Sequence, residues 1–420
     1  MVSFILAVVF GDPYNLQICV FQKGKIFTMS NPGKSVAPDG VHAMVPREKM
    51  SPGARKKRDA YAIRPDAGFY QKEFGFYCLD LWKAQGHLPL EITKDEIGAL
   101  FHYDSPGSFD LGGLGWCEAG FSPDFETKVL EDRGEYELVQ DHAGRHVLYF
   151  KGRRNGFMPE YVDHPVKDMQ SWVEKCKWRM DPTTPERYGK MDETRTKALA
   201  AAAEGRIVTQ HVIGGYMYLR SLIGPGEVLY KFYDEPELIH DCMRTWFELA
   251  DTMIARHQAF VTIDELFFGE DICYNHGPLI SPVMMKEFLV PYYQQLLTNL
   301  KRRNLDRSRH VFFQIDTDGF CDPTIPIYRD LGMDVMSPFE AASGCDVVRS
   351  GREYPGLVLC GGIDKRILAQ GTKAIDEMVS RIFPAMQARG GYIPTCDHGV
   401  PEEVRFEDYM HYRKRCLEFA

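Results

Sequence analysis

The feature that most constrains the fold is a rhythm in the second half of the chain. A short apolar run is followed by an acidic residue, a loop and an amphipathic helix, and the unit then repeats. Residues 311–319, VFFQIDTDG, show it most clearly, because the apolar run stops abruptly at Asp316 and Asp318. An apolar run of this length that ends at a turn signal is typical of a buried strand. Strands that alternate with helices predict a parallel sheet.

The rhythm predicts six strand–helix units between residue 206 and the C-terminus. We expect strands at 206–215, 261–268, 311–315, 335–339, 357–363 and 391–395. We expect helices at 236–258, 282–303, 323–331, 374–389 and 402–419, and a short one from Gly344. The first half could supply two further units, and eight would close a barrel, so we predict a TIM-type (β/α)8 barrel. The sequence contains neither of the glycine-rich nucleotide-binding motifs.

The first half is less regular. Residues 1–46 are an extension of uncertain structure, and residues 47–420 form the predicted barrel domain. Residues 126–151 alternate apolar and polar side chains around a turn at 141–144, which predicts an antiparallel hairpin. We place it in an insertion of about 115–160 beside the main fold.

Other parts of the first half show helical spacing or composition. Residues 74–89 have apolar side chains at helical intervals, and we expect their aromatic rings to lie in the core. Residues 169–180 and 192–204 also predict helices. The basic stretch 51–64 indicates the start of a solvated helix.

Composition and charge exclude several classes of protein. The chain is 44% hydrophobic and 26% charged, as in soluble globular proteins, and no apolar run approaches the length of a membrane span. A net charge of −9 argues against a general nucleic-acid binder. The 11 scattered cysteines, without a C-x-x-C pair, favour free thiols in a reducing, cytoplasmic environment.

Acidic residues follow five consecutive predicted strands, and a histidine joins them after the last. Since parallel strands of a barrel end at one face, these side chains should converge there. Asp271 and Asp364 are better explained as helix caps, which satisfy free N–H groups. The converging residues are Glu270, Asp271, Asp316, Asp318, Glu340, Asp364, Asp397 and His398.

Converging carboxylates repel one another unless a cation or a shared proton neutralises them. We therefore assign catalytic roles to Asp316, Asp318, Glu340 and His398. The predicted substrate-binding residues are Glu270, Asp271, Tyr274, Asp364 and Asp397. A divalent metal, for which Zn²⁺ is preferred, could bind at Asp316, Asp318, Cys396 and His398. The alternative is a carboxyl group with a raised pKa that acts as a general acid.

Five blocks of sequence resemble the uroporphyrinogen decarboxylase superfamily, over roughly residue 50 to the C-terminus. They are GEDICYNHGPLISPVMMKEFLVPYY (269–293), VFFQIDTDG (311–319), LGMDVMSPFE (331–340), GGIDKRILAQGTKAID (361–376) and GGYIPTCDHGVP (390–401). The resemblance implies a TIM-type barrel. It also implies one of two chemistries, because the superfamily contains porphyrinogen decarboxylases and cobalamin-linked methyltransferases, among them those that methylate coenzyme M.

The chain departs from both branches of that superfamily. The M-R-Q-A-G-R stretch of the decarboxylases, whose arginines bind substrate carboxylates, is absent. In the methyltransferases, a His-x-Cys pair and a later cysteine bind zinc. Asp316 and Asp318 stand at the positions of that pair, and Cys396 falls near the later cysteine. The resemblance therefore implies a divergent branch with a more oxygen-rich site.

Three functions remain open. The first is a corrinoid-linked methyltransferase or demethylase that acts on a small molecule, with the corrinoid free or on a separate corrinoid protein. The second is a decarboxylase of a porphyrinogen or smaller acid, with arginines such as Arg220, Arg349 or Arg366. The third is an inactive barrel that binds a ligand. We expect no nucleic-acid or membrane partner, and the resemblance implies a homodimer.

Overall fold

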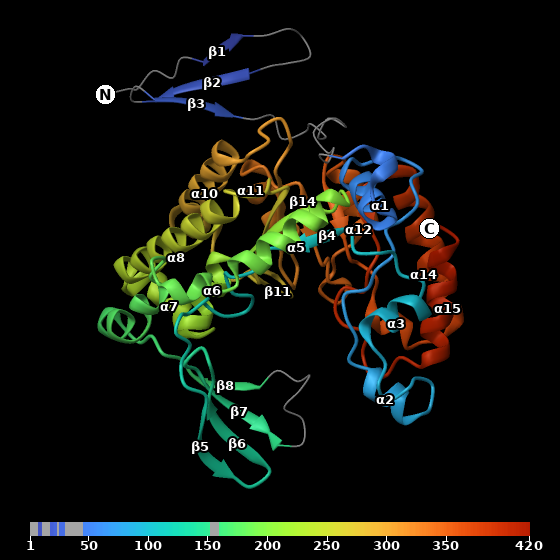
Figure 1. Ribbon diagram of the computed structural model, residues 1–420, viewed down its shortest axis with the longest axis horizontal. Helices are drawn as coiled ribbons and strands as arrows, with labels where there is room; N and C mark the ends of the chain where they lie inside the picture. Colours follow the sequence, from blue (N-terminus) through green and yellow to red (C-terminus); the bar gives the residue numbers. More distant parts are fainter. Residues whose placement is uncertain (1–6, 11–16, 23–24, 30–44, 152–158) are drawn as a thin grey trace.

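The computed structural model describes residues 7–10, 17–22, 25–29, 45–151 and 159–420. Its centre is a curled sheet of seven parallel strands in the order β16-β15-β14-β13-β10-β9-β4 (Figure 1). The strands are β4 (Ser108–Asp110), β9 (Ile207–Ile213), β10 (Glu265–Gly269), β13 (Phe312–Asp316), β14 (Val335–Ser337), β15 (Val358–Cys360) and β16 (Tyr392–Ile393). All six strands predicted after residue 206 are confirmed, most of them shorter than expected.

The strand register aligns the carboxyl ends at one edge of the sheet. Gly269, at the end of β10, pairs with Ile213 of β9 on one side and with Asp316 of β13 on the other. Asp316 in turn pairs with Ser337 of β14. The side chains and loops that follow these strands therefore leave the sheet at a common edge, where parallel α/β folds carry their chemistry.

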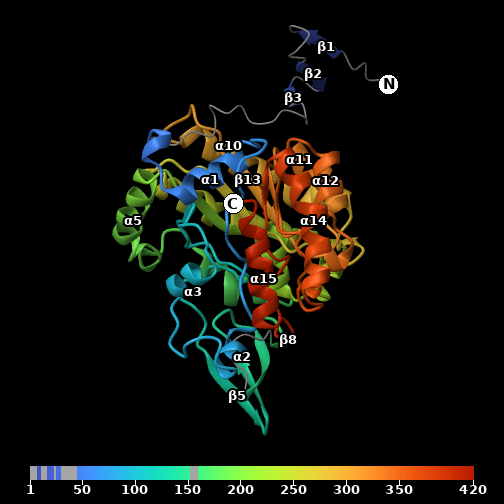
Figure 2. The same ribbon diagram turned by 90° about the vertical axis from the view of Figure 1, so that its right-hand side faces the viewer.

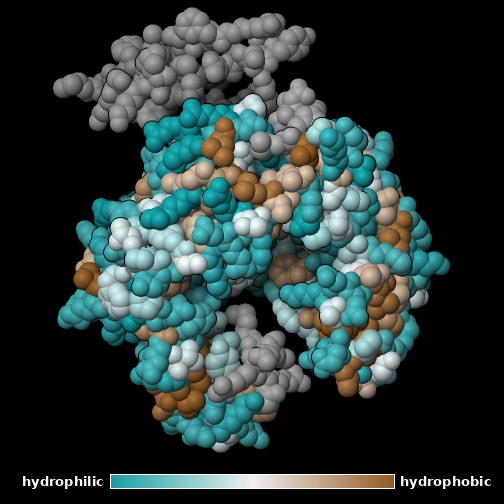
Figure 3. Space-filling model, in the orientation of Figure 1, coloured by the Kyte–Doolittle hydropathy of each residue, from teal (hydrophilic) through white to brown (hydrophobic). Residues whose placement is uncertain are grey.

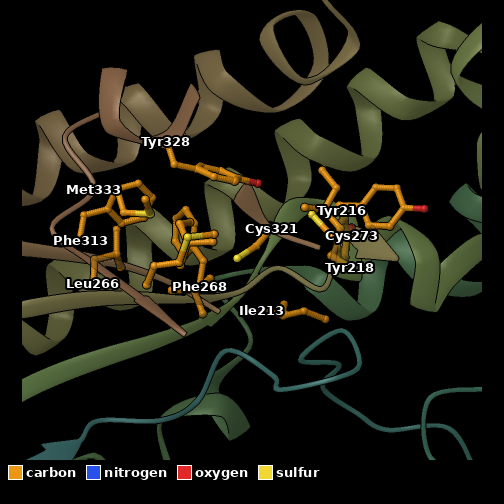
Figure 4. Close-up of a cluster of buried hydrophobic side chains, with 14 of the residues drawn as sticks. Ile213, Tyr216, Tyr218, Leu266, Phe268, Cys273, Phe313, Cys321, Tyr328 and Met333 are labelled. Atoms are coloured by element: carbon orange, nitrogen blue, oxygen red, sulfur yellow. The ribbon is translucent and has the colours of Figure 1, made fainter. Parts of the chain in front are cut away.

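Helices cover the outer face of the sheet (Figures 1 and 2). Between β9 and β13 lie α6 (Gly215–Ile223), α7 (Glu227–Asp234), α8 (Pro236–His257) and α10 (Val290–Arg303). After β13 come α11 (Ile325–Asp330), α12 (Val347–Glu353), α13 (Lys365–Leu368), α14 (Thr372–Arg389) and α15 (Phe406–Leu417). Figure 4 shows the buried side chains between sheet and helices, including Leu266, Phe268, Phe313 and Met333. None of the described helices is long and apolar enough to cross a membrane.

Residues 74–89 differ from the prediction of a single helix. Only α2 (Leu79–Ala84) is helical, and the residues before it are extended, with Phe76 paired in parallel with Val400. The extended backbone is favoured because Gly75 O accepts from the N–H of Val400 at 2.9 Å and the N–H of Tyr77 donates to Val400 O at 2.8 Å. The expectation of a core position holds for Trp82, which is fully buried, and is wrong for Phe74 and Tyr77, which are exposed.

The same segment also contacts the opposite edge of the sheet. Gln71 O accepts from the N–H of Asp104 at 2.9 Å, and the Tyr70 hydroxyl accepts from the N–H of Gly107, just before β4, at 2.8 Å. An extended segment thus lies between the β16 side and the β4 side of the curled sheet. The α/β architecture with a parallel, TIM-like sheet is therefore confirmed.

The predicted hairpin is part of a four-stranded antiparallel sheet that projects from the main body (Figure 1). Its strands are β5 (Lys128–Arg133), β6 (Tyr136–Gln140), β7 (His146–Phe150) and β8 (Glu160–Asp163). A space-filling view shows the surface hollowed between this sheet and the lobe that holds α2 (Figure 3). Arg145 and Tyr161 line the same cavity as Gly269 and Asp316, so the insertion borders the carboxyl edge of the main sheet.

The remaining first-half elements comprise several helices and a small sheet. They are α1 (Pro52–Tyr61), α3 (Lys94–Leu100), α4 (Met169–Ser171) with its continuation to Met180, and α5 (Met191–Ala203). Strands β1 (Ala7–Phe10), β2 (Gln17–Gln22) and β3 (Lys25–Met29) form an antiparallel sheet within the extension 1–46, whose other residues up to 44 lie outside the described part.

Helix α1 corrects the expectation of a solvated helix. Ser51 caps its amino end by accepting from the N–H of Ala54, and the Arg58 side chain is only 3% exposed. The Arg58 guanidinium donates to Gly205 O at 2.7 Å and to Asp264 at 3.2 Å. The basic residues of α1 therefore include buried ion-pair partners at the amino end of the sheet, which composition alone did not reveal.

Candidate active site

A cavity of about 400 Å³ opens at the carboxyl edge of the sheet. Aromatic side chains, including Phe74, Tyr77, Trp116 and Tyr161, form much of its wall. Its remaining lining residues are Cys117, Arg145, His164, Met217, Arg220, Ser221, Pro225, Gly269, Asp271, Asp316, Asp318 and His398. A concave site with apolar walls and a few converging polar groups is the usual form of a small-molecule site.

The alternation of β13 and its continuation directs Asp316 and Asp318 into the cavity. Thr317, between them, faces the opposite way, because its buried hydroxyl accepts from the N–H groups of Ile272 and Cys273 at 3.0 and 3.1 Å. Residues two apart along an extended chain share a face. The sequence D-x-D at a strand end therefore places both carboxyl groups on the cavity side.

Both carboxyl groups have raised pKa values. Burial raises the pKa of Asp316 to about 6, although the Ser337 hydroxyl donates to this carboxylate and opposes the shift. Burial, followed by the negative charges of Asp271, Asp316 and Glu340, raises the pKa of Asp318 to about 7. Close to neutral pH, Asp318 can therefore hold a proton and donate it.

His398 lies next to Asp318 in the loop after β16. Its Nε2 is 3.7 Å from Asp318 Oδ2. Its Nδ1 accepts from the N–H of Gly399 at 2.9 Å and is 3.0 Å from the Tyr77 hydroxyl. Since Nδ1 is an acceptor, we assign the proton of the neutral ring to Nε2, which faces Asp318. Partial burial and the charge of Lys365 lower the pKa of His398, which favours this neutral form.

The two arginines that line the cavity are paired with acids. Arg220 of α6 forms an ion pair with Asp271, which has a positive φ of 43°. Arg145 pairs with Asp141 at 2.7 Å and lies over the ring of Tyr161. Their charges are therefore largely neutralised within the protein.

Glu340 and Asp397 lie beside the cavity, and neither lines it. Lys365 Nζ is 3.6 Å from Glu340 and 3.7 Å from Asp397. Glu340 accepts from the N–H of Gly319 at 3.0 Å, and Asp397 accepts from the N–H of Ala341 at 2.9 Å. These acids join the loops that follow neighbouring strands, including the loop that carries Asp318.

The other predicted site residues have separate surroundings. Glu270 is fully buried and accepts from the Tyr293 hydroxyl at 2.8 Å, and burial raises its pKa to about 7. Tyr274 is exposed, and Asp364 caps α13 by accepting from the N–H of Arg366. None of the three lines the cavity. Asp364 thus has the helix-cap role that is the alternative to substrate binding.

The four predicted metal ligands are not gathered within ligating distance. Asp316, Asp318 and His398 reach the cavity, whereas Cys396 is completely buried and does not line it. Within the described residues, only Cys321, Asp322 and Cys345 have ligand atoms that all lie within 4.8 Å of one another. The donor set of the cavity therefore does not fit a resident zinc ion.

Several cavity residues were missed from the sequence. Trp116 packs against His211 with their ring centroids 4.1 Å apart, and Arg145, Tyr161 and His164 come from the insertion or its borders. The sequence places the hairpin beside the main fold and predicts no role for it in the site. The one available signal was its position in the chain, between β4 and β9, whose connecting loops reach the carboxyl edge.

A curled parallel sheet whose carboxyl edge holds a cavity with titratable side chains defines an α/β enzyme of the TIM-barrel-like class. Residues 206–418 match the family described as uroporphyrinogen decarboxylase (URO-D), and the chain belongs to this family. The resemblance seen in the sequence is thereby confirmed.

Two solved structures are similar to the chain, and the first supports the fold. A methyltransferase from Methanosarcina mazei is 12% identical with a TM-score of 0.54, covering 88% of this chain and 99% of its own. A protein described as a vitamin-B12-independent methionine synthase from Listeria monocytogenes is also 12% identical, with a TM-score of 0.34 over 84% of this chain and 97% of its own. No curated protein matches the chain.

Proposed function

We propose that this chain is a methyltransferase or demethylase of the uroporphyrinogen decarboxylase superfamily, with a corrinoid as the methyl acceptor or donor. The observation that carries the proposal is the pair of carboxyl groups, Asp316 and Asp318, that face one small cavity with raised pKa values. A protonated carboxyl beside a neutral imidazole suits protonation of a leaving oxygen or nitrogen when its methyl group departs.

The size of the cavity decides what can bind inside it. A volume of about 400 Å³ is typical of a small-molecule site. The residues that line it therefore fit the methylated substrate. A corrinoid, free or carried by a separate protein, would meet that substrate at the open side of the cavity.

In this proposal the chain supplies a proton to the atom that loses the methyl group. The bond from the methyl carbon to the oxygen or nitrogen breaks, its electron pair stays on that heteroatom, and the methyl group passes to the corrinoid acceptor. Asp318 gives its proton to the heteroatom and becomes a carboxylate. His398, with Nε2 3.7 Å away, orients and stabilises the carboxylate so formed. The aromatic walls hold the apolar body of the substrate and limit the access of water.

The decarboxylase alternative is less well supported. Uroporphyrinogen carries many carboxylates, and three acids line this cavity. Of the arginines proposed for it, Arg220 pairs with Asp271, Arg349 with Asp322 and Arg366 with Asp364. The acidic surroundings favour a substrate without a high negative charge.

We also propose that the extended segment before α2 completes the barrel as its eighth strand. Its hydrogen bonds to Val400 and to Asp104 support this, since they lie on opposite sides of the segment. Phe74 and Tyr77 would then enter the cavity from a strand end, as Asp316 and Asp318 do.

The test is methyl transfer from a panel of O-, N- and S-methyl donors to free cob(I)alamin, followed by absorbance. We expect Asp318→Asn to lower kcat by about 10²–10⁴-fold, because the amide cannot donate as an acid. Asp306→Asn, on the loop before β13, is the matched control and should retain activity. An active wild type that Asp318→Asn leaves unchanged would contradict the proposed acid. Release of CO₂ from uroporphyrinogen without methyl transfer would favour the decarboxylase instead.

A further inference from the structure

Two cysteines and an aspartate come together outside the cavity, in the loops after β13 and β14. Cys321 and Asp322 begin the 3-10 turn Asp322–Thr324, and Cys345 follows the turn Ala341–Ser343. The two sulfur atoms are 3.7 Å apart, and a carboxylate oxygen of Asp322 lies within 4.8 Å of both. Cys321 itself lies among buried core side chains (Figure 4).

The spacing of the sulfur atoms matches a tetrahedral metal site. With Zn–S bonds of about 2.3 Å, two thiolates on a tetrahedral zinc ion lie about 3.8 Å apart. A disulfide would need the sulfurs at about 2.05 Å. The two sulfurs therefore need almost no movement to bind a zinc ion. To form a disulfide bond they would have to move much closer together.

Asp322 has a buried oxygen without a partner. Its Oδ1 has no hydrogen-bond partner among the described residues, whereas its Oδ2 accepts from Arg349 Nη2 at 2.5 Å. Arg349 Nη2 also donates to Gly344 O, next to Cys345, at 3.0 Å. A ligating carboxylate is commonly held in this way by an outer hydrogen bond. The arginine would balance the net negative charge of two thiolates, one carboxylate and Zn²⁺.

An access route reaches the cluster. Cys345 lines a second cavity of about 460 Å³, together with residues of α12, α13 and α14 such as Val347, Ile367 and Met378. Three protein ligands leave one tetrahedral position, which water can occupy from this side. Thiolates select a soft or borderline ion rather than Mg²⁺ or Ca²⁺.

We propose that Cys321, Asp322 and Cys345 form a zinc-binding site that joins two loops of the carboxyl edge. Cys345 Sγ donates to Gly319 O at 3.4 Å, and Gly319 directly follows Asp318. A bound ion would therefore tie the loop that carries Asp318 to the loop that carries Glu340. The site is distinct from the acidic cavity and does not depend on the reaction proposed there.

The experiment measures metal bound to the full-length protein. Reduced protein is incubated with Zn²⁺, freed of excess metal and analysed for zinc per chain. We expect roughly one ion in the wild type and its loss in the Cys321→Ser/Cys345→Ser double variant. Cys242→Ser, which alters an equally buried thiol on α8, and Asp318→Asn, which alters the acidic cavity, should both retain it. Far-UV circular dichroism checks that each variant is folded.

Cobalt substitution gives a readout that needs no variant. Co²⁺ bound by two thiolates should give an intense thiolate-to-metal absorption band, which added Zn²⁺ should abolish. The proposal is overturned if reduced wild type binds no zinc, if the double variant retains it, or if the ion is lost only in Asp318→Asn. A Cys321–Cys345 disulfide that persists in place of metal binding after reduction would also overturn it.

Discussion

The two ends of the parallel sheet both carry acidic side chains, and these side chains have opposite kinds of partner. At the amino end, Asp264 accepts from Arg58 and from Arg309 and lies next to Glu265. At the carboxyl end, Asp316 and Asp318 face the cavity without an arginine or lysine in ion-pair contact among the described residues.

The presence or absence of a cationic partner determines whether each set of acids is ionised. A buried carboxylate with cationic partners stays ionised and contributes to stability, provided that all partners remain. Burial disfavours the charged form of a carboxyl group that lacks such a partner. The group therefore keeps its proton to a higher pH, which means that its pKa is raised. The same fold therefore places structural acids at one end and titratable acids at the other. Perturbed pKa values of this kind cluster at functional sites.

The largest expected effect is at the amino end. Asp264→Asn removes the carboxylate from between the buried guanidinium groups of Arg58 and Arg309, whose side chains are 3% and 8% exposed. We expect a loss of about 3–5 kcal/mol in the free energy of unfolding, because buried cations lose their counter-charge. Denaturant unfolding followed by circular dichroism measures it.

Asp318→Asn is the matched substitution at the carboxyl end. It should destabilise the protein by far less than Asp264→Asn, or stabilise it at neutral pH. Equal losses of stability for the two variants would show that the two ends do not differ as described.

Replacing a tyrosine by phenylalanine at each end of the sheet should give a smaller difference in stability between the two ends. Tyr61, 2% exposed, donates to Glu265, whereas Tyr77, 46% exposed, contacts His398. Tyr61→Phe should cost about 1.5–3 kcal/mol of stability, as expected for a buried hydrogen bond to a charged group. Tyr77→Phe should change stability by less than about 0.5 kcal/mol.

The effect of Tyr77→Phe should appear in the methyl-transfer rate instead. His398 keeps its tautomer through the Gly399 N–H, so we expect a decrease of only about two- to fivefold, equivalent to roughly 0.5–1 kcal/mol. A large loss of stability in Tyr77→Phe, with activity intact, would show that Tyr77 stabilises the fold, as Tyr61 is expected to do, and does not act in the reaction.

Most of the sheet could be predicted because its signals are local. The strands from β9 to β16 are apolar runs with clear ends, and the helices between them have regular spacing. The segment before α2 could not be identified in this way, because its extended form depends on hydrogen bonds to residue 400, more than 300 positions away in the chain. Its helical spacing of aromatics competed with that distant pairing and misled the prediction.

The candidate site was predictable only in part. Asp316, Asp318 and His398 follow strands, so the shared edge of a parallel sheet brings them together, as expected. Asp271 also reaches the cavity, paired with Arg220. Glu270 follows a strand as well, yet it turns beneath α6 to the Tyr293 hydroxyl. Arg145 and Tyr161 belong to the insertion, whose position against the sheet no local pattern specifies.

The last expected effect on stability is the pH dependence that Asp318 contributes. The folded protein holds its proton up to a pKa of about 7, whereas an unfolded chain releases it near pH 4. Between these values the folded state binds more protons, so rising pH shifts the equilibrium toward unfolding. Three pKa units correspond to about 4 kcal/mol. Because the side chain is 43% exposed to the cavity, solvent screening reduces this to about 1–2 kcal/mol.

Unfolding free energies of wild type and Asp318→Asn, measured from pH 4 to pH 8, test this contribution. The stability of the wild type should fall relative to the variant as pH rises from about 4 to 7, and the difference should be constant above that range. Asp306→Asn, outside the cavity, should follow the wild-type curve. If wild type and Asp318→Asn had parallel curves throughout, Asp318 would titrate like an ordinary exposed acid. The carboxyl end would then share the behaviour of the protein surface, and its proposed role as a proton donor would lose its physical basis.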